Sequence, residues 1–375
     1  MKKFFSFIIV IISILIVSSS AFAQVSYKNV NLAGLNANVV TVDLNEEIKI
    51  RTAKPDNKQV GVMSFQSFIN IYEAKAAING NYFEAYKGGN FPYGTQMKNK
   101  QMVNMEGNSA SLMVFDDYKV KLTEGTFKYN GYLDGKRKNE WNNDKNKMDF
   151  NVFSVWYVNV LPSDTAGVYI YNSFRNAPTK LNGGYVVEVV NDTVKRVFKP
   201  SETEMKLPEN GYIIYYGKDA ATSDYVSERF KPGRKVELEL IMSKKTKDGT
   251  TLFNSFKYGK EEISLSKVTD IISAGPMLIE DGKKVFAESM KGMEAKISTG
   301  AGARSVVGLT KDNKLLLVTT SGTMEQIANL MINLGCSDAF NLDGGASCAL
   351  YANGKYLRHP GRNLNTVLLI QKNNN

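Results

Sequence analysis

The sequence predicts an α+β fold, in which β-rich mixed sheets and a few flanking helices form a single large domain. Alternating, β-branched segments such as FSVWYVNVL, GYVVEVV and KVELELIM follow one another through the middle of the chain. Short turn signals separate these segments, as is typical of successive strands. Apolar residues at helical spacing are confined to a few segments, and the absence of regular strand–helix alternation argues against a βαβ architecture.

The first residues have the pattern of a secretory signal peptide. Lys2 and Lys3 precede an apolar block over residues 4–17, and small residues follow up to Ala23. The block is shorter than the roughly 20 residues of a membrane-spanning helix, which favours cleavage after Ala23 over an uncleaved anchor. We therefore expect residues 1–23 to be a signal peptide and the mature chain to be exported, periplasmic or extracellular, with no stable membrane span.

Local patterns predict the elements of the first half. Residues 24–59 are expected to form an N-terminal strand region, in which residues 39–50 alternate as one early strand. Apolar residues at helical spacing predict a helix that begins near Phe65 and stops at Asn79 and Gly80. The apolar positions of this helix are Phe65, Phe68, Ile69, Tyr72 and Ala76.

The next segments predict a loop, a hairpin and an insertion. A stretch rich in glycine and aromatic residues reads as a shaped surface loop, and SLMVF and KVKL form a hairpin pattern around Asp116 and Asp117. Residues 126–149 are polar and basic, so an insertion or a long exposed loop is expected there. The main domain is predicted to span residues 60–371.

The last third contains the clearest helix signal. Thr323 and Gln326 are placed for a capping box after the buried strand KLLLVTT, and Gly335 ends the apolar helical pattern. Asn353 and Gly354 predict a hairpin turn, and TVLLIQ predicts a final strand.

Composition and charge exclude several functions. Removal of Lys2 and Lys3 lowers the formal net charge from +10 to +8 (10 − 2), and the basic residues are scattered among acidic ones. A nucleic-acid partner is therefore not expected, although the charge is compatible with a mild attraction to anionic polymers. His359 is the single histidine, which excludes a site with two histidines. Cys336 and Cys348 are either a disulfide or two buried thiols.

Two polar segments are candidates for a site because each lies beside glycines. Residues 79–84 include Asn79, Asn81 and Glu84. The alternative to a functional site is that this segment only forms a helix C-cap. Asn341 and Asp343 share one strand face ahead of a Gly-Gly turn, where a carboxylate could bind a hard cation such as Ca²⁺ or act on a sugar carbon. The alternative there is an Asx turn.

Two further segments contain arginines. Gly300 to Ser305 contains small residues and Arg304, a combination suited to a bidentate grip on phosphate; the alternative is a flexible loop. RHPGRN contains His359 and Arg362, of which Arg362 is the better anion-binding candidate.

These segments, in this order, resemble the phosphodiester glycosidase family. The family's Asn-Leu-Asp-Gly-Gly-Gly-Ser-Ser run matches residues 341–348, and its Asn-Gly-X-aromatic-Phe segment matches residues 79–83. A Gly-Pro-X-Leu segment followed by Asp-Gly matches residues 275–282. Arg304 with its following Val-Gly pair, and the late Arg362, complete the match. The third glycine of the run is Ala346 here and its second serine is Cys348.

The resemblance implies a single large catalytic domain that hydrolyses the glycosidic bond of a sugar-1-phosphodiester, with an N-acetylglucosamine-like sugar on a phosphate-linked glycan or wall polymer. It implies no obligatory cofactor, while Ca²⁺ on Asp343 stays open. The implied catalytic residues are Asp343, Asn341 and Glu84; the implied substrate-binding residues are Asn79, Asn81, Arg304, Ser347 and Arg362. The competing hypotheses are a metal-assisted phosphodiesterase and a non-catalytic envelope protein that binds glycan.

Overall fold

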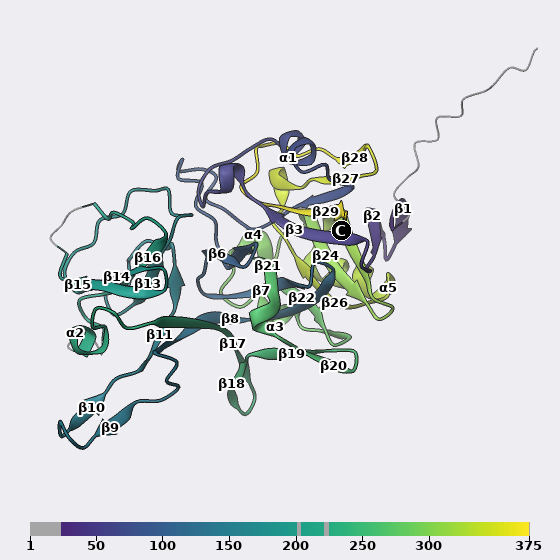
Figure 1. Ribbon diagram of the computed structural model, residues 1–375. Helices are drawn as coiled ribbons and strands as arrows, with labels where there is room; N and C mark the ends of the chain where they lie inside the picture. Colours follow the sequence, from purple (N-terminus) through teal and green to yellow (C-terminus); the bar gives the residue numbers. More distant parts are fainter. Residues whose placement is uncertain (1–23, 201–203, 221–224, 375) are drawn as a thin grey trace, which may run out of the picture.

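The computed structural model describes residues 24–200, 204–220 and 225–374, and antiparallel strands make up most of these ranges (Figure 1). The predicted signal peptide, residues 1–23, lies outside the described residues. Among the described helices, none is long and apolar enough to cross a membrane. The predicted α+β class is thus confirmed only coarsely, because a single, mostly β domain carries a few short helices.

A seven-stranded antiparallel sheet carries the last third of the chain. Its order is β1-β2-β25-β24-β26-β22-β23. Helix α5 (Met324–Asn333) covers one face, and the predicted capping box between Thr323 and Gln326 is confirmed. The strands are β1 (Val25–Leu32), β2 (Leu35–Asp43), β25 (Lys314–Gly322), β24 (Gly302–Thr310), β26 (Cys336–Asn341), β22 (Met277–Glu280) and β23 (Lys283–Lys284).

A five-stranded sheet of order β28-β27-β4-β29-β3 pairs the C-terminal strand with β3 from the early part of the chain. The predicted hairpin at Asn353 and Gly354 connects β27 to β28. The predicted helix is too long: α1 ends at Ile71, and the following apolar run forms a central strand instead. The elements are α1 (Phe65–Ile71), β28 (Lys355–Arg358), β27 (Leu350–Ala352), β4 (Ala76–Asn79), β29 (Val367–Lys372) and β3 (Ile48–Ala53).

The single early strand predicted over residues 39–50 is also wrong. Strand β2 ends at Asp43 and β3 begins at Ile48, and the two belong to different sheets. A polar turn separates them, in which the Asn45 carbonyl and side chain accept backbone N–H groups from Ile48 and Glu47.

An eight-stranded sheet of order β18-β17-β8-β7-β21-β5-β6, with β11 also paired to β8, spans the molecule. The predicted hairpin around Asp116 and Asp117 connects β7 to β8. The strands are β18 (Gly249–Phe253), β17 (Val236–Thr246), β8 (Lys119–Leu133), β7 (Asn108–Phe115), β21 (Val268–Ala274), β5 (Gln96–Lys98), β6 (Gln101–Asn104) and β11 (Val152–Val155).

The predicted insertion over residues 126–149 is therefore corrected. Its first part belongs to the long strand β8, which pairs with β17 and β11, and only the part after Leu133 forms an exposed hairpin. The polar composition suggested a loop because β8 alternates between buried residues and partly exposed polar ones. The hairpin strands are β9 (Glu140–Asn142) and β10 (Lys147–Asp149).

A smaller lobe is built on a five-stranded sheet of order β12-β13-β16-β14-β15 (left in Figure 1). Its elements are β12 (Tyr157–Val158), β13 (Val168–Tyr171), β16 (Gly211–Tyr216), β14 (Tyr185–Val190), β15 (Thr193–Phe198) and α2 (Val226–Arg229). The short elements that remain are η1 (Pro55–Asn57), β19 (Ser255–Tyr258), β20 (Glu261–Ser264), η3 (Leu265–Lys267), α3 (Phe286–Ser289), α4 (Ala295–Ser298) and η4 (Gly345–Ser347).

The apolar core explains why the sheets form one domain. One cluster of buried residues draws on three sheets, with Val307, Ile78 and Ile272 as one contribution from each. A second cluster joins the smaller lobe to the eight-stranded sheet. Cys336 and Cys348 are both buried free thiols, so the disulfide alternative is wrong.

Candidate active site

The turn after β26 places one carboxylate at the end of a buried strand. The Asp343 backbone N–H donates to the Gly80 carbonyl at 3.0 Å, which anchors the turn to the end of β4. Gly344 has no room for a side chain, since a Cβ there would lie 2.9 Å from the Ala303 carbonyl oxygen. Gly345 has φ 60°, a conformation that favours glycine. A side chain would therefore be unfavourable at both positions, which explains why both are glycine.

Asp343 is half-buried and held by donors from the same turn. The Gly344 N–H donates to Asp343 Oδ1 at 2.9 Å, so the local Asx-type bond is present, and the Ser347 hydroxyl hydrogen-bonds the same carboxylate. Burial raises the pKa of Asp343 to about 6, although these hydrogen bonds and the positive charges of Arg362 and Lys296 lower it. The carboxylate thus changes protonation close to neutral pH.

Two cations act on this carboxylate, and a third, Arg304, lies beside Gly344 of the same turn. Arg362 is half-buried, donates to the Tyr86 hydroxyl at 2.8 Å, and lies 4.9 Å from the Tyr86 ring centroid. Lys296, on α4, is exposed and acts electrostatically on Asp343. Arg304 is buried and donates to the carbonyls of Lys296 at 2.9 Å and Gly300 at 3.0 Å.

Arg304 retains hydrogen-bonding capacity. Its Nε is buried and has no partner among the described residues, and no carboxylate in those ranges forms an ion pair with the guanidinium. Arg304 lies within a strand and not in the flexible loop given as the alternative, because β24 begins at Gly302. A buried guanidinium without a carboxylate favours an anionic partner.

Asn79 and Asn81 do not face this site with free amides. Asn79 is buried at the end of β4, where it donates to the Asp343 carbonyl at 2.7 Å and accepts from Ser305 Oγ at 2.6 Å. Asn81 donates to the Tyr93 carbonyl at 3.0 Å and accepts from the Ser273 N–H at 3.3 Å. Both amides support the turn and the neighbouring loop rather than presenting themselves to a ligand.

Asn341 is buried two residues before Asp343 in a hydrogen-bond network. Its Nδ2 donates to Tyr82 Oη at 2.8 Å, to the Gly275 carbonyl at 3.0 Å and to the Leu342 carbonyl at 2.7 Å. Burial raises the pKa of Tyr82, whose hydroxyl donates to the Gly275 carbonyl at 2.7 Å. The Asn341 Oδ1 is buried without a partner among the described residues, which leaves one acceptor open.

Glu84 organises a loop and does not stand free beside Asp343. Its carboxylate accepts the backbone N–H groups of Tyr86 at 2.9 Å, Lys87 and Gly89 at 2.9 Å. The hydrogen bond from Lys87 is the main reason that the pKa of Glu84 is lowered. Because this loop presents Tyr86 to Arg362, Glu84 is better described as a positioning residue.

Ala346 and Cys348, which differ from the family's Asn-Leu-Asp-Gly-Gly-Gly-Ser-Ser motif, have different surroundings. Ala346 is exposed and does not take a positive φ, so the third position of the turn does not require glycine. Cys348 is buried, and its thiol hydrogen-bonds Ser305; burial raises its pKa.

A preformed metal centre is not found. Within the described ranges, no three His, Cys, Asp or Glu residues are grouped closely enough to hold an ion. Arg362 and Lys296 would also repel a cation at Asp343. The donor set therefore does not fit the Ca²⁺ considered from the sequence.

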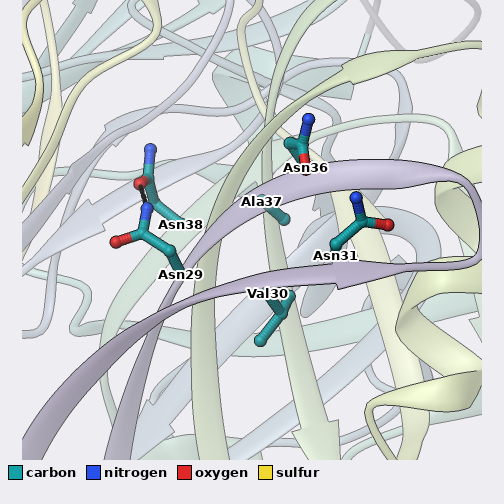
Figure 2. Close-up of a pocket in the computed structure, with 6 residues that line it drawn as sticks. All are labelled: Asn29, Val30, Asn31, Asn36, Ala37 and Asn38. Carbon is teal, nitrogen blue, oxygen red and sulfur yellow. Dashed lines mark hydrogen bonds between the residues drawn. The ribbon is translucent and has the colours of Figure 1, made fainter.

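Two hollows differ in their place: one contains a site residue, and the other lies away from the site. One of about 320 Å³ is lined by Arg362, Phe65 and His359, and the His359 ring stacks on Tyr356 with centroids 4.8 Å apart. Another, of about 380 Å³, lies on the β1–β2 hairpin, where Asn29 hydrogen-bonds Asn38 (Figure 2). The hairpin hollow contains only amide and aliphatic side chains and none of the predicted site residues.

The sequence missed some contributors to the site. Tyr82 lay within a segment that attracted notice, so its aromatic ring beside two asparagines could have indicated it. Lys296 offered no local signal, because only the fold brings α4 to Asp343. Ser305 ended a segment noted for Arg304, but only the fold brings its hydroxyl to Asn79.

Comparisons with known proteins concern the family and the fold. The sequence profile of the phosphodiester glycosidase family matches residues 176–371, just over half of the chain. No curated protein sequence matches the chain significantly.

Two solved structures share the fold, and a third is less similar. A hypothetical protein from Synechocystis has a TM-score of 0.68 and 17% identity, covering 93% of this chain and 62% of its own. A Burkholderia pseudomallei protein described as exported has a TM-score of 0.62 and 17% identity, covering 90% and 74%. The zebrafish N-acetylglucosamine-1-phosphodiester alpha-N-acetylglucosaminidase catalytic domain, auto-inhibited by its pro-peptide, has a TM-score of 0.46 and 12% identity, covering 93% and 82%.

Proposed function

The chain belongs to the phosphodiester glycosidase family, and from this premise we propose that it is an exported hydrolase that cleaves the glycosidic bond of a sugar-1-phosphodiester. The proposed sugar resembles N-acetylglucosamine, and the proposed phosphate partner is a glycan or wall polymer. The observation that carries the proposal is a half-buried carboxylate, Asp343, with a pKa of about 6 and with cations beside it. Export rests on the signal-like pattern of residues 1–23.

The proposed reaction separates the anomeric carbon from the phosphate oxygen. The C–O bond breaks and its electron pair leaves on the phosphate, which departs as a phosphomonoester. Water supplies the new hydroxyl of the sugar, and its released proton passes to solvent. A phosphodiester needs little protonation to leave, so the enzyme must chiefly stabilise charge.

The site residues divide these tasks. Arg362 and Lys296 would bind the phosphate, and Arg304 would add positive charge from below. Ionised Asp343 would stabilise the oxocarbenium-like centre and act either as the base for water or as the nucleophile. Asn341, Asn79 and Ser347 would hold the turn that aims this carboxylate. The stereochemistry of the released sugar distinguishes the two roles of Asp343.

The test is release of free sugar from N-acetylglucosamine 1-(methyl phosphate). We expect Asp343→Asn to lower kcat by a factor on the order of 100 or more, because it removes the ionisable group at the reacting carbon. Asp338→Asn is the matched control, since Asp338 is a buried carboxylate on β26, the strand that leads to Asp343. Among the described residues its carboxylate bonds Ser337 and the Asp281 N–H. Unchanged turnover in a folded Asp343→Asn protein would overturn the assignment.

Product identity separates the alternatives. Sugar phosphate with methanol would indicate a phosphodiesterase, and loss of turnover with chelator would indicate a metal. Binding of the substrate with no product, by the unaltered protein, would indicate a glycan-binding protein.

A further inference from the structure

A third cavity lies between the smaller lobe and the eight-stranded sheet, apart from Asp343. It has a volume of about 570 Å³, within the ordinary range of ligand sites, and lies between β8 and β11 on one side and β13, β16 and α2 on the other. In Figure 1 these elements gather on the left, whereas α5 and β26 lie on the right. None of the residues assigned to the candidate active site lines it.

The cavity contains an unpaired buried cation. Arg229 lines it with only 4% of its surface exposed, and its Nε has no partner among the described residues. Its contacts are a long hydrogen bond from Nη1 to Tyr216 Oη at 3.4 Å and the Phe150 ring at 5.4 Å. No ion pair to Arg229 is found within the described part of the chain. An arginine stays charged when buried, so this site favours an anion.

The opposite wall suits a sugar ring. Trp156 lines the cavity with 43% of its surface exposed, and Lys128 Nζ lies 4.6 Å from its ring centroid. Asn130 and Ser154 are directly paired across β8 and β11, so an amide and a hydroxyl stand side by side there. An indole face packs on the apolar side of a sugar, while amides and hydroxyls bond its hydroxyl groups.

The charges around the cavity limit how many negative groups it can accept. Arg137, which also lines it, forms an ion pair with Glu237, and the Tyr132 hydroxyl donates to Glu239 at 2.7 Å. Arg137 is therefore neutralised by its partner, whereas Arg229 in the cavity and Lys128 on the Trp156 ring form no ion pair within the described part of the chain.

We infer that this cavity binds a saccharide with one anionic group, a phosphate or a carboxylate, as a site separate from the one at Asp343. A separate site of this kind would let the protein hold an anionic glycan at two places. The inference goes beyond the proposed hydrolysis and stands or falls independently of it.

Tryptophan fluorescence tests the inference directly. The chain has two tryptophans, so Trp141→Phe leaves Trp156 as the only reporter. In Trp141→Phe/Asp343→Asn protein, glucose 6-phosphate or glucuronate should change the fluorescence saturably, with a midpoint on the order of 1 mM. Glucose and inorganic phosphate should each need at least about 10-fold higher concentration for the same change. Glucose lacks the anionic group, and phosphate lacks the sugar ring.

Two variants separate recognition of the anion from folding. Arg229→Gln should raise the midpoint at least about 10-fold. If that buried substitution unfolds the protein, Ser154→Asp provides the same test, because a half-buried carboxylate facing the cavity repels the ligand. Ser154→Asn is its uncharged match and should bind within about 3-fold of the unaltered protein.

The results that would overturn the inference are equally specific. They are equal midpoints for glucose and its phosphate, no saturable change with either anionic sugar, or an unchanged midpoint in Ser154→Asp. A response carried by Trp141 instead, in a Trp156→Phe protein, would also contradict it.

Discussion

At Asp343, the protein keeps a carboxylate where burial opposes its charge. Burial raises the pKa from its ordinary value of 3.8 to about 6, even though Ser347, Gly344 and two cations favour the ionised form. The ionised group therefore lowers the stability of the folded state at neutral pH. A group that destabilises the fold while it faces several cations is typical of a functional position.

This pKa predicts how Asp343→Asn alters stability with pH. Because the folded pKa is raised, the stabilisation due to Asp343 is present at low pH and is lost as pH rises through about 6. The variant does not titrate there. Compared with the unaltered protein, it should gain about 1–2 kcal/mol of unfolding free energy between roughly pH 4.5 and pH 7.5.

Denaturant titrations of both proteins at the two pH values measure this gain. Asp270, whose pKa burial also raises to about 6, is present in both proteins and cancels in the difference. A stability difference that stays constant with pH would show that Asp343 is not the perturbed group.

Arg362 provides the second prediction at this scale. Its guanidinium lies on the Tyr86 ring and acts on Asp343, so it is placed to bind the phosphate of the substrate. Arg362→Gln should lower kcat/KM by about 10- to 100-fold, as expected when one charged hydrogen bond is lost. Arg196→Gln, which removes an exposed arginine paired with Glu188, should leave kcat/KM unchanged. Equal values for the two variants would remove Arg362 from the site.

Among the elements, the turn after β26 has the strictest backbone requirements. Gly344→Ala would place a Cβ 2.9 Å from the Ala303 carbonyl oxygen, and backbone cannot move away as a flexible side chain can. We expect a loss of about 1–3 kcal/mol in unfolding free energy together with lower activity.

Ala346→Gly is the matched change in the same turn. Because Ala346 is exposed and lacks a positive φ, this substitution should cost only about 0.5–1 kcal/mol. Thermal unfolding of both variants measures the contrast, and a Gly344→Ala protein as stable as Ala346→Gly would contradict the steric account.

Elements with local signals were predictable, and elements decided by their neighbours were not. The start of α5 follows from the Thr323–Gln326 capping box, which is complete within a few residues. The run Ala76–Asn79 suits either helix or strand by itself. It becomes β4 because β27 and β29 pair with it on both sides.

For the molecule as a whole, the sequence indicates which site residues lie close together when they belong to one continuous segment. Asp343 and its glycine turn are contiguous, so their roles in the geometry could be predicted. The pairing of Arg362 with Tyr86, and the approach of Lys296 to Asp343, join distant segments through several sheets. The substrate-binding roles of Asn79 and Asn81 and the catalytic role of Glu84 stay predictions. The sequence does not show that these polar groups are already hydrogen-bonded internally.

The bond that is broken tests the central claim most directly. The purified protein should be incubated with N-acetylglucosamine 1-(methyl phosphate) in heavy-oxygen water, and both products analysed by mass spectrometry. If Asp343 supports cleavage at the anomeric carbon, the heavy oxygen enters the free sugar and the methyl phosphate stays unlabelled. Heavy oxygen in the phosphate, with an unlabelled sugar, would show cleavage at phosphorus and contradict the account.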